Sequence, residues 1–138
     1  MALWLFKEEP DHYNFSDLER AGTTLWDGVS NNLALQYLRQ VRPGDRILYY
    51  HTGKEKAVVG EMVAAAGPVP DPAQNDPRLV VVKVKAVRRL SRPVPLARIK
   101  KEAALADWEL VRLPRLSVMP VTAAQWQRIE ELSAEPMT

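Results

Sequence analysis

Short apolar blocks separated by polar turns run along this chain, and their spacing predicts more strands than helices. Four blocks are typical of buried or half-buried strands, and they cover residues 2–6, 46–51, 57–65 and 79–87. In the last block, valines alternate with Lys83 and Lys85, which predicts one buried and one exposed face. The polar stretch 52–56 indicates that the second and third strands form a hairpin.

Helix signals are short and carry recognisable caps. The predicted helices begin near Ser16, Asn32, Pro95 and Thr122. Gly22 closes the first of these helices, and a turn at residues 43–45 stops the second. Val121 and Trp126 occupy the positions of a hydrophobic staple at the last helix, whose end we expect to fray from Ser133 onward.

Prolines and one glycine mark interruptions of this pattern. Residues 67–77 hold four of the eleven prolines and are expected to form a loop. Residues 112–121 hold two more within an alternating pattern, which favours an edge strand or an extended segment. Gly60 lies inside a predicted strand, where it indicates either a bulge or a close approach to the backbone.

Together these elements predict an α+β fold. No strand–helix–strand repeat is visible, so we expect a curled, mixed and mostly antiparallel sheet with a few short helices around it. The 138 residues are enough for one domain with a core, and we expect a single domain over residues 1–138. The residues expected to be largely buried in its sheet are Leu3, Leu5, Ile47, Val59, Val82 and Val84.

Charge is distributed unevenly, although the net charge is only +2. Residues 1–76 carry seven Lys or Arg against eleven Asp or Glu, whereas residues 77–138 carry twelve against six. No acidic residue interrupts the stretch from Lys83 to Lys101, which suits an anionic polymer or, equally, a solvated face without a partner. The candidate phosphate-binding residues are Lys83, Lys85, Arg88, Arg89 and Arg92.

The candidate binding chemistry centres on the run WDGVSNN at residues 26–32. Trp26 offers a flat face for stacking, and Gly28 permits a turn that a side chain would hinder. The polar side chains of Ser30 and Asn31 can cap a helix or bind a ligand. An aromatic wall beside directional polar groups is what a nucleobase requires. A core tryptophan followed by a helix cap explains the same residues and is the commoner arrangement.

Several other chemistries lack their residues. The chain has no cysteine and only two histidines, far apart, so neither a disulfide nor a metal site is expected. Phosphate-binding glycine loops and a nucleophile elbow are absent from the sequence, and no cofactor is expected. No run of 18 apolar residues exists, so we expect no membrane span, and a cytoplasmic location fits these features.

Two further positions admit more than one role. His51 follows two tyrosines at a predicted strand end, where it could contact a ligand or bond the adjacent turn. Lys7 and Glu8 follow the first strand, where the pair could exchange protons if partly buried or could simply be solvated.

The motifs taken in series resemble the EVE domain, a family of the PUA-like superfamily. The matching segments are WLFKEEP at 4–10, WDGVSN at 26–31, GD and YYHTG within 44–53, AVVG at 57–60 and RLSVMPV at 115–121. They follow in order over nearly the whole chain, which makes the series far more specific than any one motif. Many relatives have KSEP at positions 7–10 and arginine at the position of Ser30, so a charged contact at Ser30 is not expected here.

The resemblance implies a non-catalytic PUA-like pseudo-barrel that binds DNA or RNA and accepts a flipped-out, modified base, with cytosine derivatives as candidates. The base-pocket candidates are Lys7, Glu8, Trp26, Ser30, Asn31, Tyr50, His51, Arg115 and Ser117. We expect this pocket between the strand end at 50–51 and the helix start at 30–31. Two alternatives stay open: an ASCH-like hydrolase of a modified nucleoside, with Lys7 and Glu8 as the reacting pair, and a protein-interaction module with a basic face.

Overall fold

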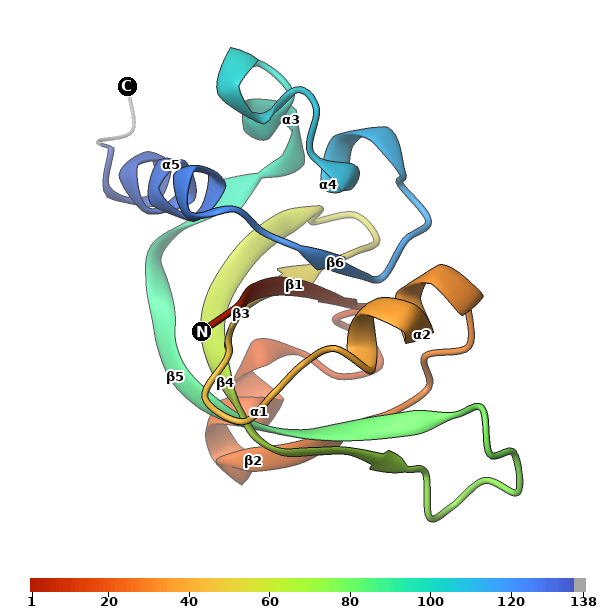
Figure 1. Cartoon of the computed structure of the whole chain (residues 1–138). Coiled ribbons are helices and arrows are strands. Elements are labelled where there is room, and N and C mark those ends of the chain that lie inside the picture. Colours follow the sequence, from red (N-terminus) through yellow and green to blue (C-terminus); the bar gives the residue numbers. More distant parts are fainter. Residues whose placement is uncertain (136–138) are drawn as a thin grey trace.

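The fold is built on one six-stranded sheet, which a computed structural model describes for residues 1–135 (Figure 1). The strands are β1 (Leu3–Glu8), β2 (Thr23–Trp26), β3 (Arg46–His51), β4 (Ala57–Pro70), β5 (Val80–Pro95) and β6 (Val118–Pro120). The helices are α1 (Phe15–Ala21), α2 (Asn32–Leu38), α3 (Leu96–Ile99), α4 (Glu109–Arg112) and α5 (Ala123–Ala134), with a 3₁₀ turn η1 (Ala103–Leu105) between α3 and α4. The strand order is β2-β5-β4-β3-β1-β6.

The sheet curls until strands near its two ends touch. β1 and β3 are parallel and the other neighbouring strands are antiparallel, which confirms the mixed, mostly antiparallel sheet. β4 and β5 are long and bend strongly in Figure 1, and their pairing shifts register at four places. Register shifts increase the twist of paired strands. As a result the rings of Phe6 in β1 and Trp26 in β2 lie 5.3 Å apart.

Gly60 shows how α1 fits against the bent sheet. A Cβ at this position would lie 2.5 Å from the ring of Phe15, the first residue of α1. The pairing of β3 with β4 also shifts register at this point, between Tyr49 and Tyr50. Both interpretations of this glycine therefore hold, because it sits beside a bulge and another group approaches its backbone closely.

Buried apolar side chains fill the inside of the curl and the space beneath the helices. Of the six sheet residues predicted to be buried, five are buried and Leu3 is half-buried. A cluster of rings with centroid separations of 5.2 to 5.5 Å lies at the centre, made of Phe6, Phe15, Trp26, Tyr49 and His51. This cluster joins three strands to α1 and sets the position of Trp26.

Several boundaries differ from the sequence prediction. β4 and β5 continue to Pro70 and Pro95, so the expected proline loop begins only after residue 70. α1 begins from a capping box formed by Asn14 and Asp17, two residues ahead of the predicted one. The sequence pattern indicates neither β2 nor α4. The predicted starts of α2, α3 and α5 are confirmed.

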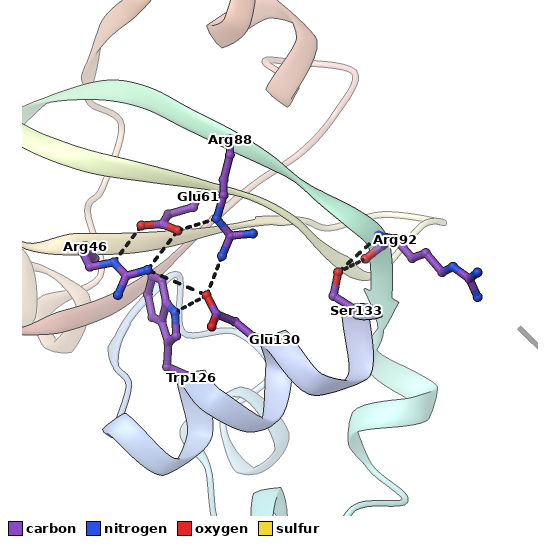
Figure 2. A network of polar contacts seen from close by, with 7 residues as sticks. All are labelled: Arg46, Glu61, Arg88, Arg92, Trp126, Glu130 and Ser133. Carbon is purple, nitrogen blue, oxygen red and sulfur yellow. Dashed lines mark hydrogen bonds and ion pairs between the residues drawn. The ribbon is translucent and has the colours of Figure 1, made fainter. Parts of the chain in front are cut away.

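A polar network fastens α5 to the sheet (Figure 2). Arg46 of β3 and Arg88 of β5 both donate to the buried carboxylate of Glu61, over N–O distances of 2.8 and 3.0 Å. Glu130 of α5 accepts hydrogen bonds from Arg88 at 2.5 Å and from the indole N–H of Trp126 at 3.1 Å. The helix is thus joined to β5 by a charged hydrogen bond and to β3 by an ion pair between Glu130 and Arg46 at 3.8 Å, and Glu61 of β4 ties the two arginines together.

The end of α5 is also held in place, so the expected fraying is wrong for Ser133. The Ser133 hydroxyl donates to the Arg92 carbonyl at 3.0 Å and accepts from the Arg92 N–H at 3.2 Å (Figure 2). Ser133 is buried because these bonds dock it on β5. The helix continues to Ala134, and the Glu135 N–H donates to the Glu131 carbonyl at 3.1 Å. Residues 136–138, the last part of the tail expected to fray, lie outside the described residues.

Candidate functional site

A cavity of about 140 Å³ opens where the ends of β1 and β2 meet the turn before α1. Its lining residues are Glu8, His12, Tyr13, Thr24, Leu25, Trp26 and Asp27. His12 and Asp27 also line an adjoining groove of about 350 Å³, which follows residues 28–30 toward Asp71 and Val80. The groove therefore adjoins the cavity, and we call the two together the Trp26 cavity and its groove.

Trp26 forms a wall of this cavity and is otherwise part of the core. Only 4% of its surface is exposed, and its ring contacts those of Phe6 and Tyr49 at 5.3 and 5.2 Å. Packing therefore fixes the ring before any ligand arrives. Trp26 is thus a core residue that also lines the cavity.

The turn that carries His12 and Tyr13 is held from two sides. The N–H groups of both residues donate to the Glu9 carbonyl, at 3.0 and 2.9 Å. The hydroxyl of Tyr49 donates to the Tyr13 carbonyl at 2.5 Å. Burial raises the pKa of Tyr49 above its ordinary value, so the hydroxyl keeps its proton and continues to donate. This wall of the cavity is therefore preorganised.

Two carboxylates line the cavity, from Glu8 at the end of β1 and from Asp27 directly after β2. A carboxylate oxygen of Glu8 accepts the Glu9 N–H at 2.8 Å and lies 3.3 Å from Nδ1 of His12. Ionised carboxylates only accept hydrogen bonds. Together with Trp26 they suit a planar ligand that carries an amino group on its edge.

Ser30 and Asn31 follow the cavity along the chain and lie apart from its wall. Ser30 is exposed and lines the adjoining groove. Asn31 caps α2 by accepting the Ala34 N–H at 3.0 Å, which is the structural role expected for this residue type. Asn31 also lines a separate hollow of about 330 Å³ together with Arg115.

His51 lies inside the ring cluster and is only 6% exposed. Its Nε2 accepts the Phe15 N–H at 3.1 Å, and its Nδ1 lies 2.7 Å from a carboxylate oxygen of Glu55. Protein groups thus occupy both ring nitrogens. This geometry corresponds to the second of the two roles expected for His51, which is to bond the neighbouring turn.

Lys7 and Tyr50 lie on the face of the sheet opposite to Glu8 and His51, because neighbouring residues of a strand alternate in direction. The Lys7 ammonium donates to the Pro114 carbonyl at 2.9 Å and lies 5.5 Å from the centre of the Tyr50 ring. Both residues line a pocket of about 180 Å³.

The expected pocket between 50–51 and 30–31 is therefore corrected. Alternation prevents Tyr50 and His51 from facing one hollow. The structure divides seven of the nine candidates among four hollows, of which the Trp26 cavity and its groove adjoin, and it buries His51 in the core. Ser117 contributes only a backbone contact, since its carbonyl accepts the Lys7 N–H at 2.9 Å. Whether these side chains contact a ligand stays a prediction.

The five candidate phosphate-binding residues divide into two kinds. Lys83 and Lys85 are exposed on β5 and form no ion pair among residues 1–135. Arg88 belongs to the α5 network, Arg89 pairs with Glu19, and half-buried Arg92 donates to the Glu135 carbonyl. The predicted positive surface is thus partly neutralised within the protein, and phosphate binding stays a prediction.

Sequence reasoning missed five lining residues of the cavity, which are His12, Tyr13, Thr24, Leu25 and Asp27. Three of them belong to or follow β2, a four-residue strand that the pattern does not indicate. Asp27 could have been predicted from the sequence, because it adjoins Trp26 in the WDG motif.

Two findings on the described residues concern membranes and metals. No helix within residues 1–135 is long and apolar enough to cross a membrane. The same part of the chain contains no group of three or more His, Asp or Glu side chains that could hold a metal ion.

The chain belongs to the EVE domain family, whose model matches residues 2–132. Human thymocyte nuclear protein 1 is 28% identical over 163 aligned residues, which cover 94% of this chain and 72% of the human protein. The resemblance drawn from the motifs is thereby confirmed.

Solved structures confirm the PUA-like α+β fold. An Agrobacterium tumefaciens protein is 30% identical and superposes with a TM-score of 0.93, covering 97% of this chain and 94% of that one. Human thymocyte nuclear protein 1 (THYN1), solved in complex with DNA containing 5-methylcytosine, is 26% identical and superposes with a TM-score of 0.92. The match covers 99% of this chain and 100% of that one. An ASCH protein from Zymomonas mobilis, 14% identical with a TM-score of 0.57 and 95% coverage of both chains, shares the fold alone.

Proposed function

We propose that this protein, acting as a single domain over residues 1–138, binds nucleic acid and holds a flipped-out cytosine derivative in the Trp26 cavity. The observation that carries the proposal is an aromatic wall beside two carboxylates, Glu8 and Asp27. Cytosine presents an exocyclic amino group, a donor that carboxylates accept. The 5-methylcytosine DNA bound to human THYN1 supports the same class of base and makes DNA the first carrier to test.

Preorganisation supports this function energetically. Taking a base out of a stack costs a few kcal/mol, which stacking and edge hydrogen bonds must offset. The Trp26 ring is already fixed by Phe6 and Tyr49, so little ordering is needed when a base arrives. The groove along residues 28–30 gives the attached sugar and backbone a path from the cavity to the surface.

We expect binding without chemical turnover. The hydrolase alternative requires Lys7 and Glu8 to act on one substrate, yet they project from opposite faces of β1. The ammonium of Lys7 contacts the Pro114 carbonyl, while the carboxylate of Glu8 lies beside His12. These separate environments support a binding module.

Fluorescence anisotropy with single-stranded oligonucleotides tests the proposal. A strand with one central 5-methylcytosine should bind more tightly than the same strand with cytosine, and DNA and RNA versions identify the carrier. Glu8→Ala should weaken binding by about tenfold, the usual worth of a hydrogen bond to a charged group. Glu9→Ala is the matched control, because Glu9 is exposed and does not line the cavity. Equal affinity for both strands, or equal effects of the two substitutions, would contradict the proposal.

A further inference from the structure

A second pocket lies on the face of β1 opposite to the Trp26 cavity, and it is lined by basic residues instead of acidic ones. It encloses about 180 Å³ between the ends of β1 and β3, the hairpin loop, and the segment from α3 to α4. Lys7, Lys56 and Lys100 line it, and no acidic residue is among its lining residues. We call it the lysine pocket.

The lysines of this pocket are not neutralised by the protein. Within residues 1–135, arginines and histidines make the ion pairs and no lysine takes part in one. Two carboxylates near Lys56 and Lys100 in the chain are engaged elsewhere: Glu55 contacts His51, and Glu102 pairs with arginines. Three like charges around one hollow repel, and a bound anion would relieve that repulsion.

Lys7 is the most enclosed of the three lysines. It is half-buried, whereas Lys56 and Lys100 are exposed at the rim. Its contact with the Pro114 carbonyl uses one of three N–H donors, which leaves two for an incoming acceptor. Burial lowers the pKa of Lys7 to about 8, and an anion beside it would favour the charged form again.

Tyr50 and two leucines give the pocket a partly apolar floor. The Tyr50 ring lies under the Lys7 ammonium, and Leu96 and Leu110 complete the lining from α3 and α4. Electrostatic attraction is stronger beside apolar groups than in open water. A compact anion that enters this pocket is therefore held more firmly than one on an open surface.

We infer that the lysine pocket binds a phosphate group of the nucleic acid whose base occupies the Trp26 cavity. This inference rests on the proposed function. Lys7 and Glu8 are consecutive residues at the end of β1, so the two sites are separated by the thickness of one strand. A nucleic-acid strand that crosses the end of β1 would place its base beside the carboxylates of the Trp26 cavity and its phosphate beside the ammonium groups of the lysine pocket.

The test compares two neighbouring lysines. Lys100→Glu should weaken binding of the 5-methylcytosine oligonucleotide by about tenfold and reduce the magnitude of the log–log salt slope by about 1, because one phosphate contact is lost. Lys101→Glu makes the same change of charge at the next residue, outside the pocket, and should change affinity less than about twofold. Circular dichroism melts establish that both variants are folded. Equal effects of the two substitutions overturn the inference.

Modified oligonucleotides identify which phosphate is bound. A neutral methylphosphonate next to the modified base should weaken wild-type binding about tenfold and leave Lys100→Glu unchanged if the pocket holds an internal phosphodiester. If the pocket instead holds a terminal phosphate of the oligonucleotide, removing that phosphate should weaken wild-type binding about tenfold and leave Lys100→Glu unchanged. If neither change distinguishes the wild type from the variant, the inference is overturned.

Inorganic phosphate separates this inference from the proposed base binding. In NMR titrations, phosphate should shift the side-chain signals of Lys7, Lys56 and Lys100 and leave Lys54 and Lys101 unshifted. Such shifts in a protein that binds no oligonucleotide would retain the anion pocket and refute the base reader. The opposite result would retain the base reader and refute the phosphate site. In that result the protein binds the modified strand selectively, phosphate causes no shift at Lys7, and Lys100→Glu and Lys101→Glu have equal effects on affinity.

Discussion

Charge is arranged in opposite ways beneath α5 and at the end of β1. Beneath α5, Arg46 and Arg88 both donate short hydrogen bonds to Glu61, and Arg88 donates another to Glu130, which also forms an ion pair with Arg46 at 3.8 Å (Figure 2). At the end of β1, carboxylates line one hollow and lysines line another, with few bonds to the rest of the protein. The first arrangement holds elements together, and the second leaves charge available for a ligand.

This difference follows the chemistry of the two cationic side chains. Arginine presents a planar fork that bonds two carboxylates at once, as Arg88 does with Glu61 and Glu130. Lysine is a compact, strongly hydrated charge on a flexible stem, and the lysines of this chain stay outside the ion pairs described. Whether a basic segment offers charge to a ligand therefore depends more on its proportion of lysine to arginine than on its total positive charge.

Trp26→Ala should produce the largest loss, and it tests whether the site depends on packing rather than charge. Removing a buried tryptophan costs about 3–5 kcal/mol of unfolding free energy. Chemical denaturation measures this loss. A loss below about 1 kcal/mol would show that Trp26 is a dispensable wall rather than part of the core.

Glu61→Ala should cost about 3 kcal/mol of unfolding free energy, because it leaves two guanidinium groups without their buried partner. Both arginines are partly exposed, which keeps the loss at the low end for a broken buried pair. Glu131→Ala, at an exposed ion pair of α5, is the control and should cost less than about 0.5 kcal/mol. Oligonucleotide affinity should stay unchanged in both variants. A loss of affinity in Glu61→Ala alone would contradict the view that the charges beneath α5 serve stability and not binding.

The affinity of the lysine pocket for a phosphodiester should fall as the pH rises above 8. The pKa of Lys7 is lowered to about 8 by burial, so the charged form that binds phosphate is present below that pH and lost above it. The fall approaches tenfold per pH unit. Lys56 and Lys100 face Lys7 across the pocket, and burial raises the pKa of Tyr50 to about 12, so Tyr50 stays neutral.

Lys7→Arg supplies the control for this pH profile, because arginine stays charged throughout the range. Its affinity should be constant between pH 7 and 9 when measured by anisotropy with the same oligonucleotide. A wild-type profile as flat as that of Lys7→Arg would remove Lys7 from the phosphate contact.

The salt dependence should change least, and it compares lysines with an arginine on the same strand. Replacing Lys83 and Lys85 together by Gln should reduce the magnitude of the log–log salt slope by up to about 2 if both contact phosphates. Arg88→Gln should leave the slope unchanged and cost about 1 kcal/mol of unfolding free energy. A lower slope in Arg88→Gln without loss of stability would show that its ion pairs open to bind DNA.

Local signals were enough to predict the parts of the fold that depend on neighbouring residues. The cap at Thr122, the turn-forming Gly22 and the strand 46–51 each bear their pattern within a few positions. The long strands were cut short in the prediction because prolines normally end strands. Pro68 is tolerated in β4 since the pairing with β5 shifts register there, between Ala66 and Val69.

The candidate site was only partly predictable, because it depends on how the sheet curls. Trp26 and Glu8, which the motif order placed among the candidates, both line the cavity. Tyr13 comes from a turn whose position is fixed by the hydroxyl of Tyr49, 36 residues away. Local pattern carries no information on such a contact, nor on which face of β3 carries Tyr50 and which carries His51.

Because Lys7 and Glu8 alternate, β1 is a partition between two faces of opposite charge, and under the proposed function each face serves a different group of the ligand. Inserting one residue ahead of Lys7 would exchange them, setting an ammonium against the amino group of the base and a carboxylate against the phosphate. The register of β1 therefore matters to the proposed binding as well as the identity of Lys7 and Glu8. The same partition makes the two recognition tasks separable, so that a change of base preference can arise at Glu8 while the anchor for the backbone is kept.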